Sequence, residues 1–389
     1  GQISGVPVMP ISSVLSATLQ LSAGVRALSL LKDRRSCIPV LGLAIMLPMS
    51  GLARAAVPAN GEYAERAVHQ VYQPAAMRFA DAGTQLLEAA QDACTVRTPE
   101  TLENLLSRFE VAVGAFSALE LYRTGPLLEE NRQNRLFYWP DKRRVGERQM
   151  RALLADAAER VPSAEDIAGK SVALQGFPAL ERLLYGKRTP LHYSEGNAAP
   201  DCQVAMAISG NIHAMADLIQ KGWQDDAAQV MSMLEPAAGS DYYRTREEVL
   251  RALVTQILVG IDIVQDRKLA ALTGEQADVK AGPLWRSAQS LNMIRNNLES
   301  LRALSIDTGL AEAADLQDEL AFEFRSADGM LQKLQALPVL ADNAGDFSSD
   351  AESLLRSLMA VVGGIRYTLN DRFVATLGIS PGFNSEDGD

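Results

Sequence analysis

The sequence predicts an all-α protein. Apolar residues recur at steps of three and four through most of the chain, which is the spacing of one face of an amphipathic helix. Hydrophobic residues make up 47% and aromatic residues only 6% of the 389 residues, and a composition rich in Ala and Leu favours helices. No sustained alternating run of β-branched residues predicts a strand. The chain is long and apolar enough to bury a large core.

The N-terminal segment 1–55 is expected to comprise a secretory signal peptide and a stretch upstream of it. Lys32, Arg34 and Arg35 form a basic cluster, the apolar run 37–52 follows, and Ala-Arg-Ala at 53–55 has the small-x-small pattern of a signal-peptidase site. The apolar run is shorter than the roughly 20 residues that a membrane span needs. We therefore expect a periplasmic or otherwise exported protein, with an uncleaved N-terminal anchor as the alternative.

Helices are expected at residues 62–93, 99–123, 144–160, 170–186, 201–234, 241–267, 283–304, 308–336 and 349–375. The second follows Thr98, Pro99 and Glu100, which supply an N-cap, a proline at the first helical position and an acid in the first turn. The sixth carries an apolar stripe at Leu250, Leu253, Val254, Ile257, Leu258, Ile261 and Val264. The last begins with Ser349 and Glu352, which have the spacing of a capping box.

Residues 186–200 interrupt the helical periodicity most clearly, because they combine glycines, prolines and charged residues. We place a domain boundary there, between an N-terminal helical bundle at 56–190 and a C-terminal helical bundle at 191–389. Each side holds four or five expected helices, and antiparallel helices joined by short loops pack into such bundles.

The cysteines allow two interpretations. Cleavage of a signal peptide would remove Cys37 and leave Cys94 and Cys202. Two cysteines in an oxidising compartment favour a disulfide. The sequence leaves open whether Cys94 and Cys202 pair or remain as two buried free thiols.

Five segments carry a resemblance to a known family. They lie at residues 125–141, 176–186, 201–223, 283–298 and 377–389, and the second reads Gly-Phe-Pro-Ala-Leu-Glu-Arg-Leu-Leu-Tyr-Gly. In this order and spacing, over residues 60–389, they resemble the imelysin-like family, also called the imelysin peptidase family. The resemblance implies an all-α fold of two bundle-like domains with a cleft between them. It also implies an exported bacterial protein linked to iron or haem acquisition, in a family of which some members are classed as metallopeptidases.

The signature motif of that family, G-x-H-x-x-E, is degenerate in this chain. Gly176 and Glu181 match it, and Pro178 stands in the histidine position. A His and a Glu three residues apart share a helix face and can hold one metal ion, whereas proline offers no donor atom. We therefore expect no metal cofactor at this motif.

Other metal-binding or nucleophilic groups are scarce in the sequence. His69, His192 and His213 are the only histidines, and neither a His-Glu-x-x-His pair nor a Gly-x-Ser-x-Gly elbow occurs. A metallopeptidase would therefore need a rearranged site that recruits His192 or His213. The alternative for each histidine is an exposed or core-satisfied imidazole.

The resemblance implies that a ligand-binding cleft is lined by Gly176, Phe177, Pro178, Glu181, Arg135, Trp139, Asp141, Arg286, Ser287 and Asn297. Arg135 and Arg286 could hold a carboxylate such as Glu181 through bidentate pairs, or form structural ion pairs. Trp139 could line the cleft or plug the end of a bundle. The serine and the asparagine could supply polar groups to a ligand or bridge helices.

Together these observations predict an exported, non-catalytic protein that binds a ligand or partner in the cleft and is linked to iron or haem acquisition. The partner would be a small molecule, a peptide or an envelope protein. A nucleic acid is not expected, because the net charge is −11 and nucleic-acid surfaces need clustered Lys and Arg. The alternatives are a metallopeptidase with a rearranged metal site and an accessory partner of an outer-membrane uptake system, associated with that membrane.

Overall fold

The computed structural model describes residues 61–186, 200–274, 277–337 and 347–379, and these residues form helices and turns without a strand. The prediction of an all-α fold is therefore confirmed. The expected signal peptide within 1–55, the boundary residues 187–199 with His192, and the end of the chain from residue 380 lie outside the described residues. No helix in the described part is long and apolar enough to cross a membrane.

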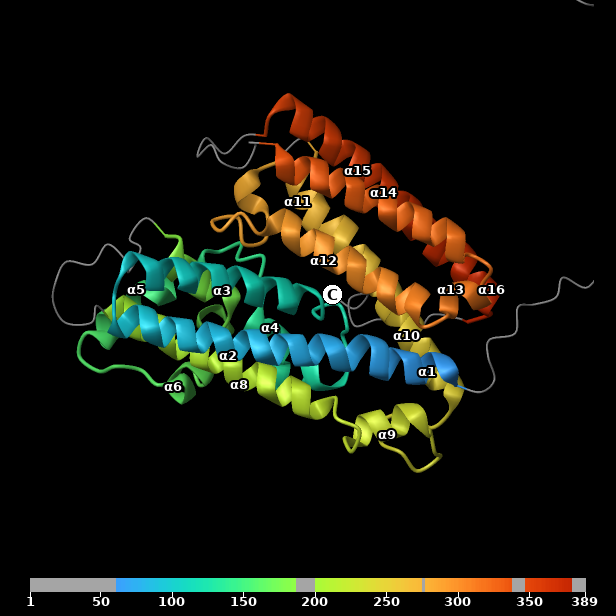
Figure 1. Ribbon diagram of the computed structural model, residues 1–389, viewed down its shortest axis with the longest axis horizontal. Coiled ribbons are helices and arrows are strands. Elements are labelled where there is room, and N and C mark those ends of the chain that lie inside the picture. The colour runs from blue at the N-terminus through green and yellow to red at the C-terminus, as the bar shows by residue number, and fades with distance from the viewer. Residues whose placement is uncertain (1–60, 187–199, 275–276, 338–346, 380–389) are drawn as a thin grey trace, which may run out of the picture. The chain divides into compact units, whose positions relative to one another are not determined.

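Two long antiparallel helices, α2 (Gln73–Thr95) and α8 (Pro200–Gly222), lie side by side, and α3 (Pro99–Ser117) packs on α2 (Figure 1). Gly83 of α2 lies close to the backbone of His213 in α8, so a side chain at residue 83 would press on that helix. The neighbouring elements are α1 (Glu62–Arg66), η1 (Ala67–Tyr72), η2 (Gly125–Leu127), η3 (Glu129–Asn131), α4 (Arg132–Leu136), α5 (Val145–Ala157), α6 (Ala164–Ala168), η4 (Val172–Leu174), α7 (Phe177–Leu184) and α9 (Ala228–Leu234).

In the second half, α12 (Ser290–Arg302) packs on α3 and on α14 (Gln317–Ala336), and α14 packs along α15 (Ser349–Tyr367) (Figure 1). Helix α10 (Arg246–Asp262) continues without a break through the π-helical η5 (Ile263–Leu269) into α11 (Ala270–Leu272). The remaining elements are η6 (Val279–Ala281), η7 (Ala303–Asp307), α13 (Leu310–Ala313), η9 (Thr368–Phe373) and α16 (Val374–Leu377).

Several helix boundaries differ from the expected ones. The helix expected at 308–336 is interrupted at Asp315, whose φ of 56° lies in the left-handed region and cannot continue a right-handed helix. The helix expected at 201–234 divides into α8 and α9. The one expected at 283–304 begins only at Ser290, after a turn, and the ones expected at 99–123 and 170–186 shorten to α3 and α7.

The two predicted helix starts have different outcomes. The start at Thr98 is confirmed, because its hydroxyl accepts the Thr101 N–H at 3.2 Å and Pro99 is the first helical residue. The start of the last helix lies one residue earlier than expected. Ser348, not Ser349, is the N-cap of α15, and its hydroxyl accepts the Ala351 N–H at 3.3 Å.

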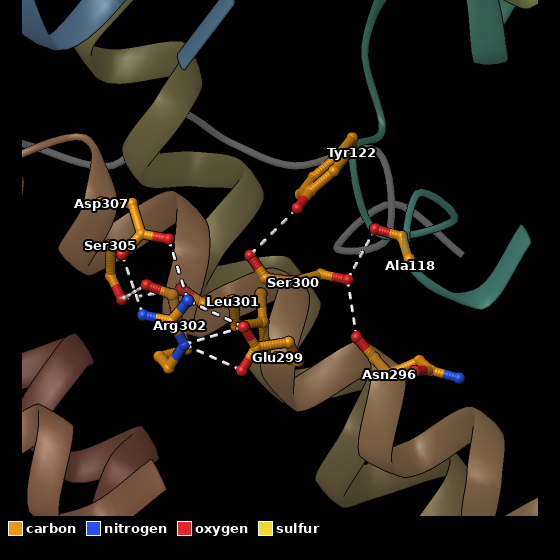
Figure 2. A network of polar contacts seen from close by, with 9 residues as sticks. All are labelled: Ala118, Tyr122, Asn296, Glu299, Ser300, Leu301, Arg302, Ser305 and Asp307. Carbon is orange, nitrogen blue, oxygen red and sulfur yellow. Dashed lines mark hydrogen bonds and ion pairs between the residues drawn. The ribbon is translucent and has the colours of Figure 1, made fainter. Parts of the chain in front are cut away.

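A polar network joins α12 to the turn that follows α3 (Figure 2). The Ser300 hydroxyl lies 2.7 Å from the Ala118 carbonyl oxygen, and the Tyr122 hydroxyl donates to the Ser300 carbonyl at 3.3 Å. On the same helix, Arg302 makes ion pairs with Glu299 and Asp307, at 2.7 Å and 2.9 Å. The Ser300 contacts hold α12 against the turn that follows α3, and the ion pair with Asp307 joins α12 to η7.

Buried side chains from Tyr63 to Leu377 form one continuous hydrophobic cluster. The structure joins Cys94 of α2 to Cys202 of α8 in a disulfide, with their Cα atoms 5.7 Å apart, so the two long helices are also linked covalently. Helix α8 lies on the C-terminal side of the expected boundary and packs on α2 from the N-terminal side. The division into domains at residue 190 stays a prediction.

Candidate functional site

The degenerate motif forms the start of α7. Gly176 is the N-cap, and a Cβ there would overlap the carbonyl oxygens of Arg135 and Leu136, so only glycine fits. Phe177 and Pro178 are the first two helical residues, where proline is tolerated because its missing N–H would have no partner within the helix. Gly176 therefore lets the start of α7 pack closely against the end of α4.

Glu181 of α7 is a buried carboxylate that Ser287 holds. Its side chain is 2% exposed, and its Oε1 atom accepts the Ser287 N–H at 2.9 Å and the Ser287 hydroxyl at 2.7 Å. Arg286 Nη1 lies 3.9 Å from Oε2. Burial raises the pKa of Glu181, while the Ser287 hydrogen bonds and the Arg286 charge oppose that rise.

The turn at residues 283–289 aims Ser287 at Glu181. Leu284 and Ala288 in this turn have φ values of 48° and 57°, which non-glycine residues rarely adopt. Such strained residues persist where the surrounding structure holds them, and they cluster at functional sites. With these two conformations, residues 283–289 form a loop in place of the first turns of the expected helix. In this loop the N–H and the hydroxyl of Ser287 both donate to the Glu181 carboxylate.

Asp141 positions a second arginine beside Glu181. Its two carboxylate oxygens accept the N–H groups of Val145 and Gly146 at the start of α5, each at 2.8 Å. Arg182 Nη2 donates to Asp141 Oδ2 at 3.0 Å, and the Arg182 side chain is 13% exposed. Burial lowers the pKa of Arg182, and the nearby Arg286 charge acts in the same direction.

A cavity of about 1060 Å³ is lined by the side chains of Asp141, Glu181, Arg182 and Arg286, among others. Five of the ten expected cleft residues line it: Trp139, Asp141, Pro178, Glu181 and Arg286. Sequence reasoning missed the other lining residues, which are Tyr138, Pro140, Lys142, Arg144, Glu147, Arg182, Asp266, Arg267, Ala270, Ala271, Lys280, Ala281, Gly282, Leu284 and Trp285. The lining comes from residues 138–182 and 266–286, on the two sides of the expected domain boundary.

The other five expected cleft residues do not line the cavity. Phe177 is fully buried and packs against Phe109 and Phe116. Arg135 does not reach Glu181, since its Nε donates to Gln175 Oε1 at 2.7 Å and its Nη1 lies 3.7 Å from Glu130. Gly176 and Ser287 position α7 and Glu181, as described above.

Asn297 belongs to a separate buried cluster. Its Nδ2 donates to the Ser117 carbonyl at 2.7 Å, and its Oδ1 accepts from Lys268 Nζ at 2.6 Å. Lys268 also pairs with Glu120. The one sequence signal for Lys268 is its place four residues after Val264, on the apolar stripe of its helix.

The residues at the motif do not fit a metal ion. The proline side chain offers no donor atom at position 178, Ser287 donates twice to Oε1 of Glu181, and the Arg286 guanidinium lies 3.9 Å from its Oε2. His69 contacts Gln73 and His213 contacts Thr84, away from the motif. Within the described ranges no group of three His, Cys, Asp or Glu side chains is placed to hold a metal.

The fold is all-helical, and the site places the buried Glu181, three residues after Pro178, at the edge of the cavity. The family model described as Imelysin matches residues 72–359, so the chain belongs to the imelysin family. Among curated proteins, no sequence matches this chain.

Two solved structures are similar in fold. An imelysin-like protein from Psychrobacter arcticum 273-4 has a TM-score of 0.63 and 21% sequence identity, over 84% of this chain and 98% of that one. A protein named iron-regulated protein A precursor, from Parabacteroides distasonis ATCC 8503, has a TM-score of 0.60 and 12% identity, over 80% of this chain and 95% of that one.

Proposed function

We propose that this imelysin-family protein is an exported, non-catalytic binding protein, whose ligand occupies the cavity beside Glu181 and whose role is in iron acquisition. The observation that carries the proposal is the state of Glu181. Glu181 has no second metal ligand beside it in the motif, because Pro178 stands in the histidine position, and Ser287 donates two hydrogen bonds to its Oε1 atom.

The cavity itself supports binding. Its volume of about 1060 Å³ lies at the upper end of the range of small-molecule sites, which are largely apolar clefts with a few placed polar groups. Two of the three tryptophans in the chain, Trp139 and Trp285, line it. The role in iron acquisition is supported by family membership and by the name of one structural neighbour, and export is supported by the signal-like segment.

The test compares two tryptophan substitutions in the full chain. Ala270→Trp adds bulk to the cavity wall, and Ala155→Trp adds the same bulk to an exposed position of α5 outside the lining of this cavity. Each protein is dialysed against a small-molecule extract of the source cells, and retained compounds are identified by mass spectrometry. We expect the wild type and Ala155→Trp to retain a compound that Ala270→Trp loses.

Two results would overturn the proposal. One is retention of no compound by the wild type, or of the same compounds by Ala270→Trp. The other is zinc-stimulated cleavage of denatured casein by the wild type, which would establish catalysis.

A further inference from the structure

The cavity is a cationic region of an acidic chain. Six basic residues line it, Lys142, Arg144, Arg182, Arg267, Lys280 and Arg286, against four acidic ones, Asp141, Glu147, Glu181 and Asp266. The whole chain carries a net charge of −11. A cavity lined by an excess of one charge sign focuses the field and concentrates ligands of the opposite sign.

Each of the four carboxylates in the wall has its own partner. Asp141 binds the N-terminus of α5 and Arg182, and Glu181 binds Ser287. Glu147 pairs with Arg144 at 2.5 Å, and Asp266 pairs at 3.1 Å with Arg366, which lies outside the lining. The carboxylates of the wall are therefore engaged and leave part of its positive charge uncompensated.

Three cations of the wall, Arg286, Lys142 and Lys280, have no close carboxylate partner in the described part of the chain. Arg286 has its nearest carboxylate only at 3.9 Å, and within the described part of the chain Lys142 and Lys280 make no ion pair. Arg286 Cζ and Lys280 Nζ lie 4.6 Å and 5.9 Å from the ring centre of Trp285. This ring holds the two cations on one shelf of the cavity, by cation–π attraction.

We propose that the cavity binds an organic polyanion, a molecule with at least two carboxylate groups on an aromatic or apolar body. Two separate cations, Arg286 and Lys280 on the Trp285 shelf, match at least two anionic groups. The volume exceeds what a single inorganic anion needs, and Tyr138, Trp139 and Leu284 offer apolar surface to the rest of the ligand. This inference rests on the proposed binding role, and it adds the chemical class of the ligand.

The test uses benzene-1,3,5-tricarboxylate, citrate, inorganic phosphate and the uncharged 1,3,5-tris(hydroxymethyl)benzene. Binding to the full chain is measured by isothermal titration calorimetry at low and high salt. We expect the aromatic tricarboxylate to bind most tightly, citrate next and phosphate more weakly. The uncharged compound should not bind, and salt should weaken binding of the anions.

Substitutions locate the binding. Lys280→Gln removes one exposed cation from the shelf and should weaken tricarboxylate binding roughly tenfold, the effect of losing one charge-assisted contact. The matched control, Lys333→Gln on the exposed face of α14, should leave binding unchanged. Arg286→Gln should weaken binding at least as much as Lys280→Gln.

The outcomes separate this inference from the binding role. Equal binding by Lys280→Gln and Lys333→Gln, or binding of the uncharged compound as tight as that of the anions, would overturn the polyanion assignment. If the wild type retains a compound from the cell extract and Ala270→Trp does not, the binding role would still be supported. Tighter binding of phosphate than of both carboxylates would show that the anion is an inorganic or phosphorylated one, and would also overturn the assignment.

Discussion

Glu181 and Glu120 are both buried carboxylates, 2% and 4% exposed, but the protein compensates their charges in different ways. Glu120 pairs with the ammonium of Lys268 inside the core. Glu181 receives the uncharged N–H and hydroxyl of Ser287. In the core an ammonium contacts the carboxylate directly, whereas at the cavity the Ser287 dipoles contact it and the Arg286 charge stays 3.9 Å away, where a ligand can also reach it.

The two clusters are neighbours in sequence and in space. Arg267 and Lys268 are consecutive residues of the π-helical η5, and Arg267 lines the cavity while Lys268 is buried at 1% exposure. Trp139 lines the large cavity and also a small one of about 60 Å³ beside Glu120. π-Helical turns often occur at functional sites, and this one supplies a cation to each cluster.

The largest effect should come from breaking the core pair. Lys268→Met leaves Glu120 buried without its cation, and one oxygen of Glu120 already has no hydrogen-bond partner in the described structure. We expect the free energy of unfolding, measured with urea, to fall by about 3–5 kcal/mol, the usual result of removing one partner of a buried pair.

The control for this prediction is the double variant Glu120→Leu with Lys268→Met. It removes both charges, so it should be more stable than Lys268→Met alone. A single variant that loses less than about 1 kcal/mol would show that the pair does not compensate a buried charge.

A smaller, pH-dependent effect should come from Ser287→Ala. This change removes the hydroxyl that donates to Glu181 at 2.7 Å but keeps the backbone N–H, and a hydrogen bond to a charged group contributes about 1.5–3 kcal/mol. The pKa of Glu181 is already raised in the folded state, so its contribution to stability is full below its unfolded pKa and is lost as pH rises through the folded pKa. Removing the hydroxyl raises the folded pKa further, and the loss of stability should therefore grow from pH 4 to pH 8.

Urea unfolding of wild type and variant at both pH values measures this difference. Ser290→Ala is the matched control, because its hydroxyl donates to the neutral Pro283 carbonyl at 2.6 Å in the same loop. Its cost should be the same at both pH values. A cost of Ser287→Ala that is equally independent of pH would mean that Glu181 is not the group Ser287 stabilises.

Part of the fold and part of the candidate site could be predicted from the sequence. The helical periodicity and the Thr98 cap are local signals, and the structure confirms both the all-α fold and that cap. The resemblance led to Glu181 and Arg286 through short motifs. Arg182 lies in the same motif segment, directly after Glu181, but was not predicted as a cleft residue, and nothing local distinguishes Lys280 among the 37 basic residues. Only tertiary packing brings them to one cavity.

The loop around Ser287 was missed for a different reason. The segment 283–304 has helical periodicity, but its first residues adopt a turn with two left-handed backbone conformations. Propensity favours a helix there, and the contact of Ser287 with Glu181, 106 residues away, overrides it. Long-range contacts of this kind leave no trace in a local pattern.

The smallest effect should come from restoring the motif histidine. Pro178→His puts an imidazole on the second residue of α7, three residues before Glu181, at a position where a new N–H needs no helical partner. Tight zinc binding needs three or four protein ligands, and the Ser287 hydrogen bonds and the Arg286 charge already compete for Glu181. We expect no stoichiometric zinc after equilibrium dialysis and elemental analysis, as for the control Pro178→Ala. One zinc per chain in Pro178→His but not in Pro178→Ala would contradict this prediction. It would mean that Glu181 can leave Ser287 and bind a metal, whereas Glu120 stays paired with Lys268 in the core.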